Sequence, residues 1–255
     1  MPVVILCGGL GTRLREETEF KPKPMVEIGG KPVLWHIMKT YAYYGFRRFI
    51  LCLGYKGDII KEYFLNYEAM SNDFTIHLGQ ENKLAYQSKH PEQDFDVTVV
   101  DTGLKTMTGG RVKRIERFIE SDTFMVTYGD GLANVDIGAL VAFHCQHGKL
   151  ATLTAARPPS RYGLLEMTAD GQVQRFREKV QAEWINGGFL VFNRRVFDYL
   201  DLGCVLEREP MERLAADGQL MAFRHEGFWI GMDTYREYEM LNQMWAAGTV
   251  PWKIW

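Results

Sequence analysis

The stretch VVILCGGLGTRL, residues 3–14, joins an apolar run to a glycine-rich loop. Its first five residues are apolar, which is typical of a short buried strand. Gly8, Gly9 and Gly11 follow at once, and glycine leaves backbone N–H groups unobstructed by a Cβ atom. We therefore expect a strand that ends in a phosphate-binding loop. An ordinary tight turn between a strand and a helix is the alternative.

Short apolar runs recur along the chain and alternate with helical patterns. Strands are predicted at 49–53, 97–100, 124–127 and 151–155. Helices are predicted between Pro32 and Gly45 and at 58–67, 112–118, 137–147 and 235–247. Because strands that alternate with helices form a mostly parallel sheet, the chain is assigned to the α/β class, with a Rossmann-like sheet flanked by helices.

The pattern changes near residue 158, where short alternating segments replace the strand–helix alternation. Antiparallel strands are predicted at 164–167, 172–176 and 185–192, with turns at Asp170-Gly171 and Gly187-Gly188. We interpret them as an antiparallel lobe appended to the first sheet. Because no linker-like composition separates the two parts, we expect one domain, 1–255, with halves at 1–157 and 158–255. The polar segment 80–96 fits a loop or a hairpin.

Composition narrows the classes of function. With 255 residues, 46% hydrophobic and 24% charged, the chain can bury a substantial core, which excludes disorder and a disulfide-stapled miniature. Thirty basic and 32 acidic residues give a formal charge of −2, so neither sequence-independent nucleic-acid binding nor a polybasic membrane surface is expected. Four scattered cysteines, the lack of an apolar run of about 20 residues and the lack of a basic leader favour a cytoplasmic protein.

Basic residues follow the glycine loop at short distance. Arg13 lies inside the loop, and the segment KPKPM at 21–25 comes next. Its prolines restrict the backbone to extended geometry, so Lys21 and Lys23 project to one side. A dinucleotide-binding fingerprint needs a glycine where Leu14 stands, and the Gly-Lys-Ser/Thr of a P-loop is missing. The segment predicts a polyphosphate clamp; a solvated basic surface is the other interpretation.

Two acidic residues are candidates for holding a cation. Asp130 follows the apolar run 124–126 and is therefore expected at the carboxyl end of a strand, where ligands bind in open α/β sheets. A carboxylate that faces a phosphate pocket needs a cation between them, and Mg²⁺ is the best candidate. Asp233 precedes the last helix and joins this site only if the fold brings it to Asp130. Each residue could instead serve a turn or cap a helix.

Two other features favour structural roles. His144, Cys145 and His147 lie on a predicted helix without a carboxylate, a set more typical of a half-buried face than of a metal site. Three tryptophans at the end of the chain, between 245 and 255, indicate a tail packed on the body or on a neighbouring subunit. We expect a homo-oligomer.

The glycine loop together with the KPKPM segment resembles the signature of the sugar-1-phosphate nucleotidyltransferases. The resemblance covers nearly the whole chain and is carried by 26–64, 100–103, 108–111, 128–131, 186–189 and 251–253. It is weakest over 80–96 and 158–183. It implies the fold of the nucleotide-diphospho-sugar transferases, with the nucleotide bound by 1–157 and the sugar phosphate by 158–255.

The resemblance also implies a reaction and a set of site residues. CTP and a hexose 1-phosphate, with glucose 1-phosphate expected, would give a CDP-sugar and pyrophosphate with Mg²⁺ as cofactor. Catalytic roles fall to Arg13 and Lys23, and metal binding to Asp130 and Asp233. The residues expected at the nucleotide are Leu6, Gly8, Gly9, Gly11, Thr12, Lys105, Gly110, Arg111 and Gly129. Those expected at the sugar phosphate are Tyr162, Gly163, Glu178, Lys179, Asn186 and Gly187.

Three positions depart from the family pattern. Val180 follows Glu178-Lys179 where proline is usual, and Ile230-Gly231 precedes the second acidic motif where a polar residue and proline are common. Lys105 stands where a small hydroxyl residue is typical. Because the first two changes fall in the sugar-phosphate half, another phosphate acceptor is an open alternative. A nucleotide-binding subunit that has lost catalysis is a second one, and the intact phosphate clamp counts against it.

Overall fold

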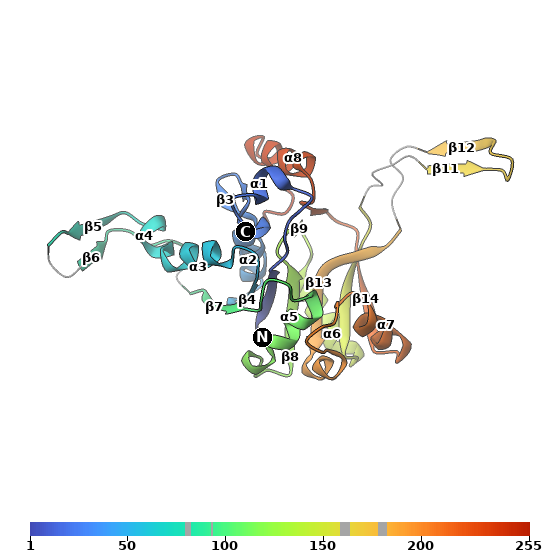
Figure 1. Cartoon of the computed structure of the whole chain (residues 1–255), viewed down its shortest axis with the longest axis horizontal. Helices are drawn as coiled ribbons and strands as arrows, with labels where there is room; N and C mark the ends of the chain where they lie inside the picture. Colours follow the sequence, from blue (N-terminus) through green and yellow to red (C-terminus); the bar gives the residue numbers. More distant parts are fainter. Residues whose placement is uncertain (80–82, 93, 159–163, 178–182) are drawn as a thin grey trace.

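The computed structural model describes the chain except for residues 80–82, 93, 159–163 and 178–182. Its centre is a seven-stranded sheet in the order β14-β10-β13-β8-β1-β4-β7 (Figure 1). The strands are β1 (Val3–Cys7), β4 (Arg48–Leu53), β7 (Asp96–Asp101), β8 (Thr123–Tyr128), β10 (Ala151–Ala156), β13 (Ile185–Asn193) and β14 (Leu220–His225). The five strands predicted for the first half of the chain are thus confirmed.

All strands of this sheet except β13 run in one direction. β1 pairs in parallel with β4 and with β8, whereas β13 is antiparallel to both of its neighbours. The chain leaves β1 toward β4 and β7 and later returns to β8 on the other side of β1. The order of strands therefore reverses between β1 and β8, and the carboxyl ends of such strands form the crevice where open α/β sheets bind ligands.

Helices cover both faces of the sheet, because successive strand residues point to opposite sides. One face packs on α2 (Val33–Tyr43), α3 (Gly57–Leu65), α6 (Ile137–His147) and α8 (Tyr235–Ala246). The other packs on α5 (Thr108–Arg114), α7 (Glu209–Ala216) and the 3₁₀-helix η3 (Arg194–Tyr199). The shorter helices are α1 (Arg15–Thr18), α4 (Tyr67–Ser71), η1 (Lys23–Met25) and η2 (Glu116–Phe118). In the part of the chain that the structure describes, no helix combines the length and the apolarity needed to span a membrane.

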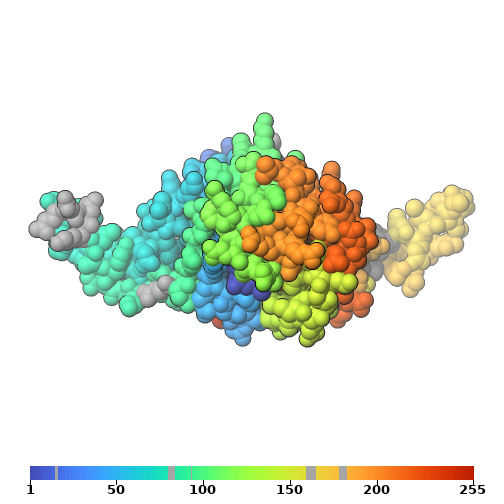
Figure 2. All heavy atoms as spheres, turned by 90° about the horizontal axis from the view of Figure 1, so that it is seen from below, coloured from blue at the N-terminus to red at the C-terminus, as the bar shows by residue number. Residues whose placement is uncertain are grey.

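Smaller two-stranded sheets surround the main one. They are β2–β3 (Glu27–Ile28 and Lys31–Pro32), β5–β6 (Phe74–His77 and Lys83–Tyr86), β9–β15 (Gly131–Ala133 and Trp229–Gly231) and β11–β12 (Leu164–Met167 and Val173–Arg177). The hairpins β5–β6 and β11–β12 project from opposite ends of the molecule, as Figures 1 and 2 show. The segment 80–96 thus contributes the second strand of a hairpin.

The second half differs from the prediction in one respect. Gly187 and Gly188 form no turn, because both lie inside β13, where its register with β10 shifts. Gly188 has a φ of +78°, and a bulge gives the same glycine signal as a turn. The antiparallel segments are therefore divided: β13 enters the main sheet, and β11–β12 forms a separate hairpin.

Two helices also differ in their bounds. The helix predicted at 112–118 begins earlier, at Thr108, and ends as η2. The helix predicted at 58–67 is divided into α3 and α4. At the C-terminus, Trp252 is fully buried, and the rings of Trp245, Trp252 and Trp255 surround His36 of α2. The aromatic tail thus packs on the body of its own chain.

Candidate active site

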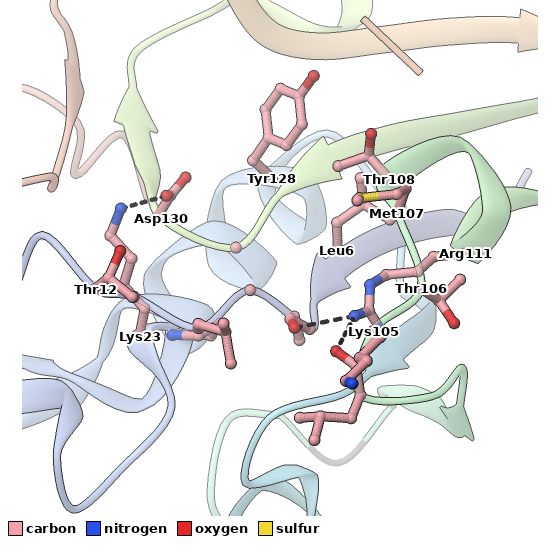
Figure 3. Close-up of a pocket in the computed structure, with 18 of the residues that line it drawn as sticks. Leu6, Thr12, Lys23, Lys105, Thr106, Met107, Thr108, Arg111, Tyr128 and Asp130 are labelled. Atoms are coloured by element: carbon pink, nitrogen blue, oxygen red, sulfur yellow. Dashed lines mark hydrogen bonds and ion pairs between the residues drawn. The ribbon is translucent and has the colours of Figure 1, made fainter. Parts of the chain in front are cut away.

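A pocket of about 680 Å³ opens at the carboxyl ends of β1 and β8, where the strand order reverses. Its walls are the glycine loop at 8–13, Lys23-Pro24, the segment 104–108, Arg111 and Tyr128 to Asp130. Figure 3 shows Lys23 and Asp130 at one end of the pocket and Lys105, Thr106 and Arg111 at the other. Of the residues that the family resemblance assigns to the nucleotide, Leu6, Gly8, Gly9, Gly11, Thr12, Lys105, Arg111 and Gly129 line this pocket.

Arg111 supports the glycine loop through hydrogen bonds. Its side chain is buried, and its Nη1 and Nη2 donate to the carbonyls of Leu53 (2.8 Å) and Gly8 (3.0 Å). A Cβ atom on Gly8 would lie 2.1 Å from the Arg111 guanidinium carbon, so only glycine allows this approach. Nη1 also donates to the Thr102 hydroxyl at 2.7 Å. The guanidinium thus fixes the loop, a role that its position in the sequence did not reveal.

The rest of the loop is fixed by Thr18. Its hydroxyl donates to the carbonyls of Gly11 (2.9 Å) and Leu14 (2.7 Å). Gly11 has a φ of +64°, a conformation that favours glycine. The position of a Cβ atom on Gly9, by contrast, is open, with no atom within 4 Å. The loop therefore presents backbone groups at Gly9 to the pocket, while its two flanks are held in place.

Cysteines near the pocket are not activated. Cys7 and Cys52 are buried beneath the glycine loop, and burial raises the pKa of Cys52 to about 12 and that of Cys7 well above its ordinary value. Because the thiolate is the reactive form, a thiol with a raised pKa is a poor nucleophile. The pocket therefore offers charge and backbone donors rather than a covalent nucleophile.

Lys23 is the centre of the charged end of the pocket. Its Nζ contacts Asp130 Oδ2 at 2.6 Å and Asp233 Oδ1 at 2.8 Å, and the side chain is 11% exposed. Burial, the largest single influence, lowers the pKa of Lys23, but the two carboxylates together outweigh it and hold that pKa above its ordinary value. Arg13 Nη1 contacts the other oxygen of Asp233 at 3.1 Å, with a side chain that is 70% exposed. All four residues predicted for catalysis and metal binding therefore meet.

The pairing of β9 with β15 brings the two aspartates together. Gly231 lies opposite Gly131, and Met232 N donates to the Asp130 carbonyl at 3.0 Å. Each aspartate thus adjoins one strand of the same small sheet, although 103 positions separate them in the sequence. The spacing of the two motifs could not show this contact.

Glu207 contacts two residues of the pocket wall, and the sequence did not indicate it. It lies in the connection before α7 and accepts hydrogen bonds from the Tyr128 hydroxyl and from Thr108 Oγ1, the latter at 2.6 Å. Burial, and then the neighbouring Glu207, raise the pKa of Tyr128 well above its ordinary value. The Tyr128 hydroxyl also accepts from Asn186 Nδ2 at 3.3 Å. This set joins two residues of the pocket wall to Asn186, one of the residues expected at the sugar phosphate.

The other predicted residues have different surroundings. Gly110 does not line the pocket; a Cβ atom there would lie 2.3 Å from the Leu202 carbonyl oxygen, so its role is close packing. Gly187 accepts a hydrogen bond from Trp229 Nε1 at 2.7 Å. The predicted positions Tyr162, Gly163, Glu178 and Lys179 lie outside the described residues.

The histidines of α6 have a structural role. His144 Nδ1 and His147 Nε2 both share hydrogen bonds with the Thr152 hydroxyl, at 2.8 Å and 2.7 Å. Among the described residues, no group of three or more His, Cys, Asp or Glu side chains is arranged to hold a metal ion. The prediction of a half-buried face at His144 and His147 therefore agrees with the contacts.

Comparison with known proteins places these features in context. The model of the nucleotidyl transferase family matches residues 2–229. A glucose-1-phosphate cytidylyltransferase from Salmonella typhimurium is 52% identical over 259 residues, covering 100% of both chains. A Bacillus subtilis protein named probable glucose-1-phosphate cytidylyltransferase is 46% identical over 260 residues with the same coverage. The crystal structure of HddC from Yersinia pseudotuberculosis superposes with a TM-score of 0.70 at 25% identity, over 96% of this chain and 99% of the other.

Proposed function

The chain belongs to the nucleotidyl transferase family, and from that premise we propose that it joins CTP to glucose 1-phosphate, giving CDP-glucose and pyrophosphate. The likeness to cytidylyltransferases over the full length of both chains supports the choice of nucleotide and acceptor. The single observation that carries the chemistry is the largely buried ammonium of Lys23 between Asp130 and Asp233, beside the glycine loop.

The reaction is a transfer of a nucleotidyl group. An oxygen of the sugar phosphate forms a bond to the α-phosphorus of CTP, and the bond from that phosphorus to the bridging oxygen of the β-phosphate breaks. The departing pyrophosphate keeps the electron pair. Because no protein nucleophile is needed, the protein must position two polyanions and offset the charge that develops on the leaving group.

The residues of the pocket suit that task. The glycine loop offers backbone N–H donors for the triphosphate. Arg111 and Thr18 fix the flanks of the loop, so these donors keep their positions. Lys23 and Arg13 supply positive charge at the same end of the pocket and are assigned to the leaving side. Lys179 is assigned to the attacking sugar phosphate on the family resemblance alone.

Asp130 and Asp233 fit a Mg²⁺ ion. Both present oxygen ligands to one point, because both contact the same ammonium nitrogen. Mg²⁺ in phosphoryl-transfer sites is commonly held by one or two carboxylates, with substrate phosphates and water completing its shell. When bound, the ion would offset negative charge on the triphosphate, and the two carboxylates would hold it beside Lys23.

Release of pyrophosphate tests this proposal. The four ribonucleoside triphosphates and dTTP are each supplied with Mg²⁺ and with glucose 1-phosphate or one of several other phosphates. We expect product only with CTP and glucose 1-phosphate. Signal with CTP and a different phosphate would keep the mechanism and replace the acceptor. Binding of CTP without product from any acceptor would instead identify a nucleotide-binding subunit that has lost catalysis.

We also propose that a second copy of the chain covers the projecting hairpins. In β5–β6 the side chains of Phe74, Ile76, Leu84 and Tyr86 share one face, and each is more than 40% exposed. In β11–β12 the exposed apolar residues are Leu165, Met167, Val173 and Phe176. An isolated two-stranded hairpin is marginal in water, so such faces favour a partner. Sedimentation of the purified chain tests this, and a monomer at micromolar concentration would contradict it.

A further inference from the structure

The contact between Lys23 and Asp233 joins segments 210 residues apart, and helix α8 anchors both of them. Asp233 lies two residues before α8 begins. Lys23 lies in η1, just before the hairpin β2–β3, and that hairpin packs on α8. The relative position of the two charged groups therefore depends on how each segment is fastened to this one helix.

Glu237 fastens the Asp233 end. Its Oε2 accepts hydrogen bonds from the backbone N–H groups of Asp233 (3.0 Å) and Thr234 (2.6 Å) and from Thr234 Oγ1 (2.9 Å). Thr234 and Glu237 form a capping box, which satisfies the open backbone donors of the first turn of the helix. The loop that carries Asp233 is thus fixed to the first turn of α8.

Asn242 fastens the Lys23 end. Its Oδ1 accepts from Gly29 N at 3.0 Å, and its Nδ2 donates to the Glu27 carbonyl at 3.3 Å. Both partners belong to the hairpin β2–β3, which follows η1 directly. The helix approaches closely here, because a Cβ atom on Gly29 would lie 2.1 Å from the Trp245 ring and Gly29 has a φ of +59°.

We propose that Asn242 is a positioning residue for the charged end of the pocket. It holds the strand that follows Lys23 at a fixed place along α8, about two turns from Asp233, so that the ammonium and the two carboxylates keep their spacing. Asn242 does not line the pocket; it acts through Lys23 and through the carboxylates that are proposed to bind Mg²⁺. The inference rests on the proposed function.

Two variants and a control test this role. Asn242→Ala removes both bonds to the hairpin, and the nearly isosteric Asn242→Asp keeps an acceptor for Gly29 N while it removes the donor to the Glu27 carbonyl. The control is Asn66→Ala. Asn66 Nδ2 donates to the Glu62 carbonyl, four residues earlier, at 2.9 Å, just as Asn242 Nδ2 donates to the Tyr238 carbonyl at 3.2 Å. Asn66 therefore makes the same kind of bond, to a carbonyl four residues earlier, that Asn242 makes to Tyr238. In sequence, Asn66 lies far from the residues of the pocket.

The primary measurement is CTP affinity by calorimetry, with excess Mg²⁺ and with EDTA, because it needs no turnover. The ratio of the two affinities reports how well the carboxylates and Lys23 hold the metal–nucleotide complex. Changes to groups that orient metal ligands commonly cost about tenfold or more in metal affinity. We expect Asn242→Ala to lower the ratio about tenfold, Asn242→Asp to lower it in the same direction, and Asn66→Ala to leave it unchanged.

The outcomes separate this inference from the proposed function. A lower thermal midpoint in both Asn242 variants with an unchanged affinity ratio would mean that Asn242 is merely structural and would overturn the inference. An unchanged ratio at an unchanged midpoint would overturn it as well. Release of pyrophosphate by the wild-type chain tests the function independently: its failure would refute the proposed reaction, whereas the affinity ratio would still report on Asn242.

Discussion

Two connections leave the carboxyl ends of strands in this molecule, and they are built in opposite ways. The glycine loop after β1 is held by two side chains from elsewhere: the buried Arg111 bonds the Gly8 carbonyl, and Thr18 bonds the Gly11 carbonyl. The hairpin β11–β12, which follows β10, is held by its own ladder, and the side chains at 165–167 and 173–177 are exposed or nearly so. The loop is preorganised by the rest of the fold, whereas the hairpin is not.

The difference indicates how the work of the protein is divided. The charged groups expected to bind the triphosphate lie on segments with many tertiary contacts. Such groups are preorganised, so they need no rearrangement during the reaction. The part of the chain that departs most from the family pattern adjoins the exposed hairpin. We therefore expect substitutions at the pocket to have large effects on rate and substitutions on the hairpin to have small effects on stability.

The largest effect is expected for Asp130→Ala. The change removes one of the two carboxylates that bracket Lys23, and loss of one preorganised electrostatic contact commonly lowers the rate by about 10²-fold or more. Pyrophosphate release at saturating CTP measures it. The control is Asp136→Ala, which removes the cap of α6 (Asp136 Oδ1 accepts from Ala139 N at 2.8 Å) outside the pocket. Wild-type turnover in Asp130→Ala would refute the assignment of Asp130 to the metal site.

Gly8→Ala should have the next largest effect. The new Cβ atom would displace the Arg111 guanidinium and break its buried hydrogen bonds, at a cost of about 2–4 kcal/mol in the free energy of unfolding. Urea denaturation measures this cost, and CTP affinity should fall with it. Gly9→Ala is the matched control, because its Cβ atom would meet nothing within 4 Å. Equal stabilities for the two variants would show that the loop is not fixed by Arg111.

Acid should destabilise the body of the protein through His36. Burial, partly offset by the Ile28 and Lys31 carbonyls, lowers the pKa of His36 to about 4, against about 6.5 in the unfolded chain. Between pH 6.5 and pH 4 the unfolded state therefore binds a proton at His36, whereas the folded state keeps His36 neutral. The contribution of His36 to the free energy of unfolding is thus present above pH 6.5 and is lost as the pH falls toward 4. The loss is roughly 3 kcal/mol at its greatest. Urea denaturation at pH 7, 5.5 and 4.5 measures it, and equal stabilities would contradict the expectation.

Glu207→Gln should have a moderate effect. The amide still reaches Tyr128 and Thr108, but it replaces hydrogen bonds to a charged acceptor, which are worth about 1.5–3 kcal/mol, with weaker neutral ones. We expect kcat/KM to fall about fivefold. If Glu207 joins the two sides of the pocket, the KM values for CTP and for the sugar phosphate should both rise. A change confined to one substrate would separate the two sides.

The smallest effect on folding is expected on the hairpin. Phe176 is 62% exposed, so Phe176→Ser should change the free energy of unfolding of the monomer by about 0.5 kcal/mol or less. Phe189, in β13, is buried, and Phe189→Ala should cost about 3–5 kcal/mol. Urea denaturation at low protein concentration compares the two. A large loss in Phe176→Ser under these conditions would mean that the hairpin packs on its own chain.

Local pattern was enough to predict most of the sheet and part of the site. The strands at 3–7, 49–53 and 124–127 were found because a buried parallel strand is a short apolar run between helices. The glycines at 187 and 188 misled, since Gly188, with its positive φ, serves a bulge inside a strand, and a glycine in that conformation is equally typical of a turn between strands. The predicted residues in 159–163 and 178–182 lie outside the described part of the chain and stay predictions.

The class of fold, the glycine loop and the clustered basic residues that follow it could be predicted from the sequence, because each depends on neighbours within a few positions. Three contacts arise only from tertiary packing: Asp233 meets Asp130 across Lys23, Glu207 bonds Tyr128, and Asn242 bonds the hairpin next to Lys23. Each of these contacts spans more than 75 residues, and no local preference of the chain encodes such a distance. They arise from the pairing and packing of whole elements, which bring together groups that the sequence keeps apart.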